Sequence, residues 1–200
     1  MLRRVLALLL ILALPTTAVA ARLSSTVFDA PRALPAFALE DHSGKPYGPE
    51  RLKGHWTLIL IGYTNCPDVC PFTLSNLEAL IAELSQTMMP DKLPRVVFLA
   101  ADPKRDTLLL ADYVAHFHPD FVGVTGALDQ IDLLVKGLDG FVRRDKPDAD
   151  GNYRVSHSAA VSIVGPDGTL RGRIMPPFPP AETAAFLANL MRARTVGDAR

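Results

Sequence analysis

Two cysteines at the junction between an apolar segment and an amphipathic segment constrain this chain more than any other feature. Cys66 and Cys70 are the only cysteines in the sequence. Residues 56–63 before them form a short, continuous apolar run, which predicts a buried strand. Residues 72–88 after them repeat leucine and isoleucine at helical spacing. Both thiols are therefore expected where a strand ends and a helix begins, and the N–H groups and dipole of a helix N-terminus favour the thiolate form.

The N-terminus has the pattern of a targeting segment. Arg3 and Arg4 precede an apolar run at 5–14 and an Ala-Val-Ala cleavage pattern at 18–20. The run is shorter than the roughly 20 residues that span a bilayer easily. This favours export to the periplasm with cleavage after Ala20 over the alternative, an uncleaved anchor in the inner membrane. The net charge of +0 gives no reason to expect binding to nucleic acid, and association with a membrane is expected only through the N-terminus.

One folded domain is expected after this segment. The composition, 48% hydrophobic and 21% charged, is that of a globular protein. We divide the chain into a signal peptide at 1–20, an extended lead-in at 21–35, the folded domain at 36–193 and a tail at 194–200.

Strands and helices alternate along the expected domain. Besides the segments around the cysteines, apolar runs predict strands at 36–41, 95–100, 121–125, 159–164 and 169–174, and periodic apolar residues predict helices at 107–117, 128–138 and 181–191. Asp106 is a suitable N-cap for the helix at 107–117. Residues 165–168 predict a hairpin turn that joins two antiparallel strands at an edge of the sheet. This order predicts an α/β fold, a thioredoxin-like three-layer sandwich with a mixed central sheet.

The cysteine spacing is compatible with a disulfide or with a metal site. Three residues separate Cys66 from Cys70, against two in the usual disulfide oxidoreductase motif. If Cys70 begins the helix and Cys66 lies in the loop before it, the sulfurs can form a disulfide or hold one soft cation. Two thiolates suit Cu(I), and a neutral imidazole would complete a trigonal site. His157, just before the predicted strand at 159–164, is the leading candidate for that imidazole.

The remaining soft or aromatic side chains are expected to have structural roles. Trp56 and the phenylalanines are assigned to the core, and Asp68 to a solvated loop. The other histidines are assigned to turns, to a strand entry or to the end of a helix, and the methionines considered as ligands are assigned to packing or to the ends of elements. These residues are His42, His55, His116, His118, Met88, Met89 and Met175.

Four motifs then occur in a specific order. They are Gly-Tyr-Thr-Asn-Cys-Pro-Asp-Val-Cys-Pro at 62–71, Asp-Pro-Lys-Arg-Asp-Thr at 102–107, Gly-Val-Thr-Gly at 123–126 and His-Ser-Ala at 157–159. Together they resemble the Sco/SenC family, and the resemblance extends from about residue 37 to residue 190. It implies a thioredoxin-like copper chaperone that serves assembly of the dinuclear Cu-A centre of cytochrome c oxidase, by copper delivery, by thiol–disulfide reduction, or by both.

The resemblance also implies roles for individual residues. Cys66, Cys70 and His157 match the family's ligands for copper, which is expected as Cu(I), with Cu(II) left open. Asp102 and Asp106 match an acidic loop near that site with at most a supporting role. The implied recipient is cytochrome c oxidase subunit II or another copper enzyme, with an upstream copper donor.

The chain departs from the family pattern at two positions next to the matched ligands. Asn65 stands where family members often have histidine, and Ser156 stands where they often have aspartate. Neither position is a ligand, so metal binding is expected to survive. The loss of an acid beside His157 would alter the basicity of that histidine or the surface offered to a partner.

Three other functions remain open from the residues. As a thiol–disulfide oxidoreductase, the protein would use Cys66 and Cys70 as a redox pair without needing His157. A thiol peroxidase would need a Thr/Arg arrangement beside a cysteine, and the sequence offers no such arrangement that we can identify. A structural disulfide is the common role of two cysteines in an exported chain.

Overall fold

The computed structural model describes residues 22–197, so the predicted signal peptide lies outside the described residues. The strands are β1 (Ser24–Ala33), β2 (Leu39–Asp41), β3 (Pro46–Tyr47), β4 (Thr57–Gly62), β5 (Arg95–Ala100), β6 (Val122–Thr125), β7 (Val142–Arg144), β8 (Val155–His157), β9 (Val161–Val164) and β10 (Thr169–Met175). The α-helices are α1 (Val69–Ser85), α2 (Pro103–Asp106), α3 (Leu110–Phe117), α4 (Leu128–Gly137) and α5 (Pro180–Gly197), and the 3-10 turns are η1 (Pro49–Leu52) and η2 (Pro90–Lys92).

Eight of the described strands form one mixed sheet in the order β1-β10-β9-β4-β5-β6-β2-β3. The central strands β4, β5 and β6 are parallel, and β9 pairs antiparallel to the other side of β4. Every residue of β4 is buried, as expected for a parallel strand that is covered on both faces. The predicted α/β sandwich with a mixed central sheet is confirmed.

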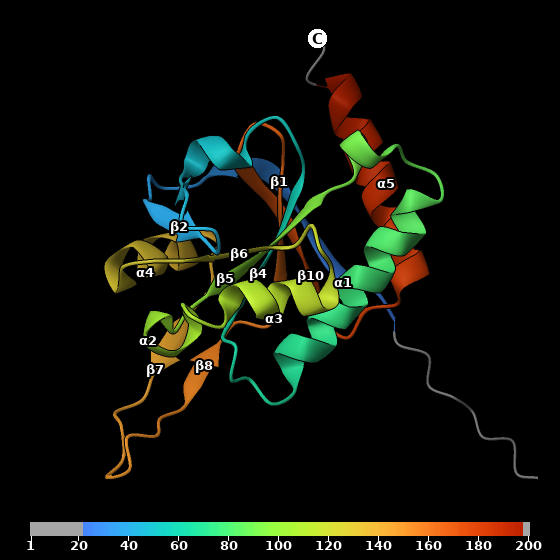
Figure 1. The fold of residues 1–200 in the computed structure, drawn as a ribbon. Helices are drawn as coiled ribbons and strands as arrows, with labels where there is room; N and C mark the ends of the chain where they lie inside the picture. Colours follow the sequence, from blue (N-terminus) through green and yellow to red (C-terminus); the bar gives the residue numbers. More distant parts are fainter. Residues whose placement is uncertain (1–21, 198–200) are drawn as a thin grey trace, which may run out of the picture.

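Helices cover both faces of this sheet (Figure 1). Alternate residues of β4 point to opposite faces, so that Leu58 and Leu60 pack with α1, α3 and α5, whereas Ile59 and Ile61 pack with α4. Two apolar cores therefore lie on either side of the sheet. They hold the carboxyl end of β4 in a fixed position, and the residues that follow it supply two of the three side chains of the candidate site.

The lead-in and the C-terminal hairpin differ from their predicted placement. Residues 24–33 are not a separate arm but strand β1, which pairs antiparallel to β10 with a register shift between Val27 and Arg32. The β9–β10 hairpin forms as predicted, yet it is not an edge of the sheet, because β1 covers β10. Strand β1 was not predicted because most of its residues are polar or exposed, and a strand at the edge of a sheet needs few buried residues.

The prediction for Asp106 was wrong. Asp106 ends the short helix α2, and α3 begins only at Leu110, so its carboxylate caps no helix at 107–117. The carboxylate is instead fully buried and binds a distant segment described below.

At the other end of the chain, α5 extends to Gly197, beyond the predicted start of the tail at 194.

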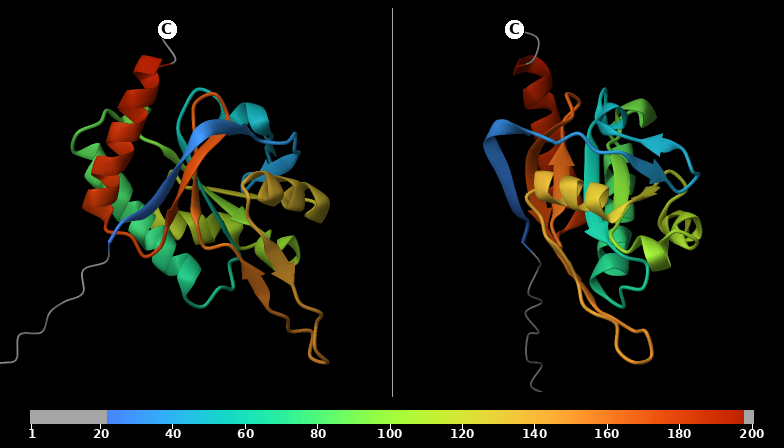
Figure 2. Two further views of the ribbon diagram at one scale, coloured as in Figure 1. Left: turned by 180° about the vertical axis from the view of Figure 1, so that it is seen from behind. Right: turned by 90° about the vertical axis from the view of Figure 1, so that its left-hand side faces the viewer.

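Strands β7 and β8 were not predicted. They form a separate two-stranded sheet, joined by a turn-rich loop, that projects from the body of the molecule (Figure 2). Two phenylalanines also depart from the expected core positions, since Phe72 and Phe141 are exposed. No helix within the described range is long and apolar enough to cross a membrane.

Candidate metal centre

The end of β4 and the first turn of α1 position the two cysteines. Cys66 lies in the intervening loop, where its backbone N–H donates to the carbonyl of Tyr63 at 3.2 Å. Cys70 is the second residue of α1 and is completely buried, whereas Cys66 retains 9% of its accessible surface. Both are free cysteines. The predicted arrangement, with one thiol in the loop and the other at the start of the helix, is confirmed.

Gly62, the last residue of β4, makes room for the buried thiol. A Cβ atom at this position would lie 2.8 Å from Cζ of Phe98 and 2.9 Å from Sγ of Cys70. Both separations are shorter than an ordinary van der Waals contact, because packed carbon atoms lie about 3.5–4.0 Å apart. A side chain at position 62 would therefore displace the thiol or the aromatic ring.

His157, the last residue of β8, approaches the cysteines from the separate hairpin. Its Nε2 atom lies 3.5 Å from Sγ of Cys70, and its Nδ1 atom lies 3.0 Å from the carbonyl oxygen of Ser158. Nδ1–H can donate to that carbonyl, which leaves the lone pair of Nε2 directed at the thiols. The ring of Tyr63 makes a T-shaped contact with the imidazole of His157, with the ring centroids 5.8 Å apart, and this contact further fixes the plane of the imidazole.

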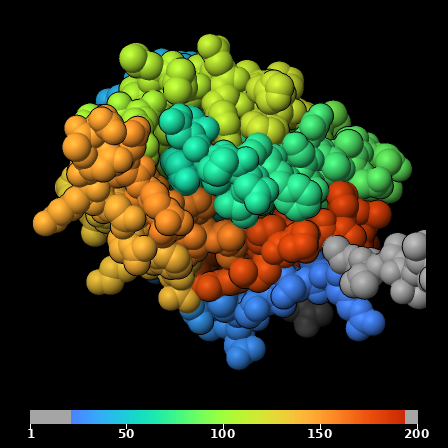
Figure 3. Space-filling view, turned by 90° about the horizontal axis from the view of Figure 1, so that it is seen from below, coloured from blue at the N-terminus to red at the C-terminus, as the bar shows by residue number. Residues whose placement is uncertain are grey.

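The three side chains thus meet although 87 residues separate Cys70 from His157 in sequence. Their potential ligand atoms all lie within 4.8 Å of one another, and no other group of His, Cys, Asp or Glu in the described part of the chain has such an arrangement. Figure 3 shows the start of α1 beside the β7–β8 hairpin on one face. Two thiols and one imidazole nitrogen form a donor set suited to a soft cation.

Burial sets the protonation of this site in the absence of a cation. It raises the pKa of the Cys70 thiol, and a hydrogen bond with the backbone of Tyr63 offsets only part of that effect. The expectation that the helix N-terminus would favour the thiolate is therefore wrong for Cys70, because burial has the largest effect on its pKa. Burial also lowers the pKa of His157, so that the imidazole is neutral at pH 7 and its Nε2 can act as a ligand.

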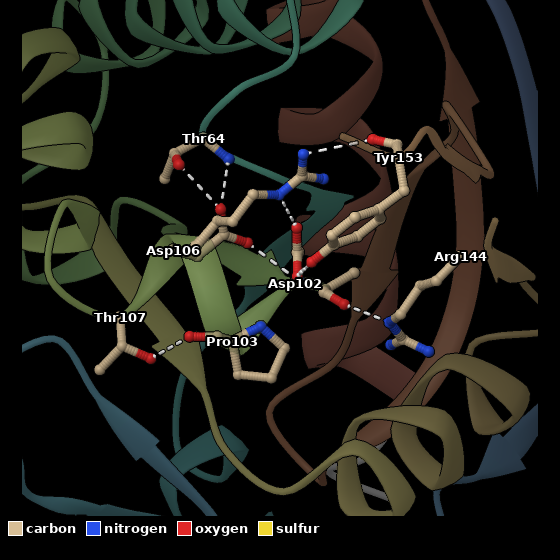
Figure 4. Close-up of polar contacts among 9 residues, drawn as sticks. Thr64, Asp102, Pro103, Asp106, Thr107, Arg144 and Tyr153 are labelled. Carbon is tan, nitrogen blue, oxygen red and sulfur yellow. Dashed lines mark hydrogen bonds and ion pairs between the residues drawn. The ribbon is translucent and has the colours of Figure 1, made fainter. Parts of the chain in front are cut away.

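The acidic loop lies between the cysteine loop and the hairpin (Figure 4). Asp106 accepts hydrogen bonds from the backbone N–H of Thr64 at 2.8 Å and from its hydroxyl at 2.7 Å. Burial raises the pKa of the Asp106 carboxyl, although these hydrogen bonds oppose the shift. Asp102, which is also buried, accepts a hydrogen bond from the hydroxyl of Tyr153 at 2.6 Å. Neither acid belongs to the group of potential ligands.

The other candidates lie outside that group. His42 accepts a hydrogen bond from the backbone of Gly123, and His118 accepts one from the backbone of Asp120. Met175 lines a cavity of about 220 Å³ that His157 also borders, but it is not among the clustered ligands. Sequence reasoning assigned no role to Thr64, Arg105 or Tyr153, although Thr64 and Arg105 belong to the motifs at 62–71 and 102–107; no pattern or motif marks Tyr153.

Comparison with known proteins agrees with this geometry. The sequence model of the SCO1/SenC family matches residues 27–192. The chain belongs to the SCO1/SenC family. A protein of Stutzerimonas stutzeri is 38% identical over 148 residues, which cover 74% of this chain and 71% of that protein. The human mitochondrial SCO1 homolog is 34% identical over 158 residues, which cover 78% of this chain and 52% of the human protein.

A solved structure of a SCO1/SenC relative has the same fold. The structure of Bradyrhizobium japonicum ScoI with copper bound superimposes with a TM-score of 0.70 and 29% identity, over 78% of this chain and 98% of that one. The thioredoxin-like fold predicted from the position of the cysteines is confirmed. In this SCO1/SenC chain, the loop after β4, the first turn of α1 and the hairpin of β7 and β8 each supply one of the three clustered side chains.

Proposed function

We propose that this SCO1/SenC protein is a metallochaperone that carries copper as its cargo. Cys66 and Cys70 supply two thiolates, and Nε2 of His157 supplies the third ligand. The observation that carries the proposal is the convergence of these three ligand atoms within 4.8 Å, with Nε2 of His157 facing Sγ of Cys70. The copper-bound state of the similar B. japonicum ScoI supports copper as the cation.

The proposed recipient is a cuproprotein, and the family resemblance favours the Cu-A centre of cytochrome c oxidase, in its subunit II. Loading would take place in the periplasm, in keeping with the targeting pattern at 1–20. Cu(I) is the favoured oxidation state, because two thiolates are soft ligands. An upstream protein would supply the copper.

Replacing His157 by alanine tests the trigonal site. His157→Ala is expected to weaken Cu(I) binding at least about tenfold, the lower bound for residues that merely support metal ligands. The free energy of unfolding should change much less, because the side chain is at the end of a peripheral strand. Titration of the reduced protein against a competing Cu(I) chelator measures the affinity, and denaturant unfolding measures the stability.

His116→Ala is the matched control, because it removes an exposed imidazole from α3. It should bind one equivalent of Cu(I) as tightly as the wild type. Equal affinity of His157→Ala and wild type would contradict the histidine ligand. If no copper binds stoichiometrically and reduction of the cysteines destabilises the fold, a structural disulfide accounts for the pair instead.

Thiol–disulfide reduction is the second candidate function, and the unequal burial of the two thiols favours it. Cys66, once its thiol has lost its proton, can attack an accessible disulfide of a partner, forming a mixed disulfide and releasing one partner thiolate, which takes up a proton. Cys70 then loses its proton and attacks Cys66, which expels the second partner thiolate. The chain ends as a disulfide and the partner as a dithiol. This reaction would prepare the cysteines of a copper site for loading.

Cys70→Ser separates the two steps of this reaction. Cys66 of this variant is expected to form a mixed disulfide with a disulfide-linked peptide, and the adduct should persist because no second thiol resolves it. Cys66→Ser should form far less adduct, since Cys70 is completely buried. Mass spectrometry measures both. Equal adduct formation by the two variants would contradict the assignment of Cys66 as the attacking thiol.

A further inference from the structure

The strand that carries His157 is not part of the main sheet. Strands β7 and β8 pair only with each other, over three residue pairs. An isolated two-stranded hairpin is at best marginally stable in water. The distance between the imidazole and the cysteines therefore depends on the contacts that hold this hairpin to the rest of the protein.

Polar contacts tie both arms of the hairpin to the segment after β5. On the β8 side, the Tyr153 hydroxyl donates to Oδ1 of Asp102 at 2.6 Å, and Arg105 donates to the carbonyl of Tyr153 at 3.2 Å. The Arg105 guanidinium also lies 3.9 Å from the centroid of the Tyr153 ring and pairs with Oδ2 of Asp102. On the β7 side, Arg144 donates to the carbonyl of Ala101 at 2.6 Å.

The same segment is bonded to the cysteine loop. The backbone N–H of Asp102 donates to Oδ2 of Asp106 at 3.0 Å, while Oδ1 of Asp106 accepts both hydrogen bonds from Thr64. Thr64 lies two residues before Cys66, and Tyr153 lies four residues before His157. A continuous chain of hydrogen bonds, Thr64–Asp106–Asp102–Tyr153, thus connects the two parts of the chain that bear the clustered ligands (Figure 4).

We propose that Tyr153 and Asp102 are positioning residues of the copper site, which hold the hairpin so that Nε2 of His157 stays within bonding reach of the cation held by the cysteines. This inference rests on the proposed copper function. It extends that function because neither residue is among the proposed ligands.

The burial of the two partners supports a specific role for the Tyr153 hydroxyl. Asp102 is only 2% exposed, and the hydroxyl is one of the few donors that satisfy its carboxylate. The aromatic ring of Tyr153 is only half-buried and makes a separate contact with Arg105. Tyr153→Phe therefore removes the hydroxyl bond and retains the ring contact, so it tests the positioning role with little change in packing.

A double-mutant cycle on copper affinity separates positioning from general stability. Tyr153→Phe is expected to weaken Cu(I) binding about tenfold, in the range seen when residues that orient metal ligands are changed. In the His157→Ala background the same substitution should cause no further loss, because there is no imidazole left to position. Competition with a Cu(I) chelator measures all four proteins.

Tyr47→Phe is the matched control, since it makes the same chemical change in β3 at the far edge of the sheet. It should leave copper affinity unchanged in both backgrounds. Equal losses of copper affinity for Tyr153→Phe with and without His157 would contradict positioning and leave a structural role. No loss of affinity in either background would also contradict positioning. An unchanged affinity of His157→Ala alone would instead contradict the histidine ligand of the proposed copper site.

Hydrogen exchange in the copper-free protein gives a second, independent measurement. The backbone N–H of Ser158 donates to the carbonyl of Phe141 across the hairpin, at 3.1 Å. Tyr153→Phe should increase the exchange rate of this amide, whereas Tyr47→Phe should not. Unchanged exchange would overturn the inference, because the hairpin would then keep its position without the hydroxyl.

Discussion

Replacing Cys70 by serine is expected to lower Cu(I) affinity by more than about 100-fold, the upper end for residues that only support metal ligands. The expected loss is large because a hydroxyl oxygen is a hard donor and Cu(I) selects thiolates. Cys70 is also the sulfur that His157 approaches, at 3.5 Å, so its loss would leave Cys66 and the imidazole without the central ligand. Competition with a chelator under reducing conditions measures the affinity.

Cys70→Ala is the matched control for the change at this buried position. Alanine and serine both remove the sulfur, but only serine places a hydroxyl in the apolar surroundings of Cys70. The two variants should lose copper equally and differ only in the free energy of unfolding. Retention of copper by Cys70→Ser within tenfold of the wild type would exclude Cys70 as a ligand.

Gly62→Ala is expected to damage both the fold and the site. The new Cβ would overlap Phe98 and Sγ of Cys70, and such overpacking costs about 1–3 kcal/mol of folding free energy. The thiol is the smaller of the two neighbours, so relaxation would displace it from its position 3.5 Å from Nε2 of His157. Copper affinity should therefore fall along with stability. Denaturant unfolding and chelator competition on the same preparation measure both effects.

Gly137→Ala serves as the control for overpacking without a change in the site. A Cβ there would lie 3.0 Å from Cγ of Pro35, where α4 packs on the lead-in, far along the chain from either cysteine. This variant should lose stability and keep its copper affinity. If Gly62→Ala behaved in the same way, the close approach of Cys70 to Gly62 would matter for packing alone.

The centre of the fold could be predicted from the sequence because burial alone determines it. Strands β4 and β5 are short apolar runs, and α1 has a regular apolar stripe, so local patterns and tertiary packing agree. Strands β7 and β8 could not be predicted, because each has three residues and only Val155 among them is buried. Patterns of hydrophobicity carry no signal for strands so short and so exposed.

The candidate site was predictable only in part. The positions of Cys66 and Cys70 followed from the strand–helix junction, whereas His157 was singled out chiefly by the family resemblance. Asp106 was misassigned because an aspartate before a helical pattern resembles an N-cap, while its carboxylate binds Thr64, 42 residues away. Contacts over such separations depend on the assembled fold and leave no trace in local sequence.

The position of the histidine outside the main sheet has a consequence for how copper could leave the protein. Moving β8 away from the cysteines requires the loss of the contacts that tie the hairpin to the segment after β5, while the eight-stranded sheet and both apolar cores stay intact. In the proposed function, a recipient that competes for those contacts would lower the coordination number of Cu(I) from three to two. The two-coordinate ion would then be open to a ligand from the recipient, and transfer would proceed by stepwise ligand exchange without unfolding the carrier.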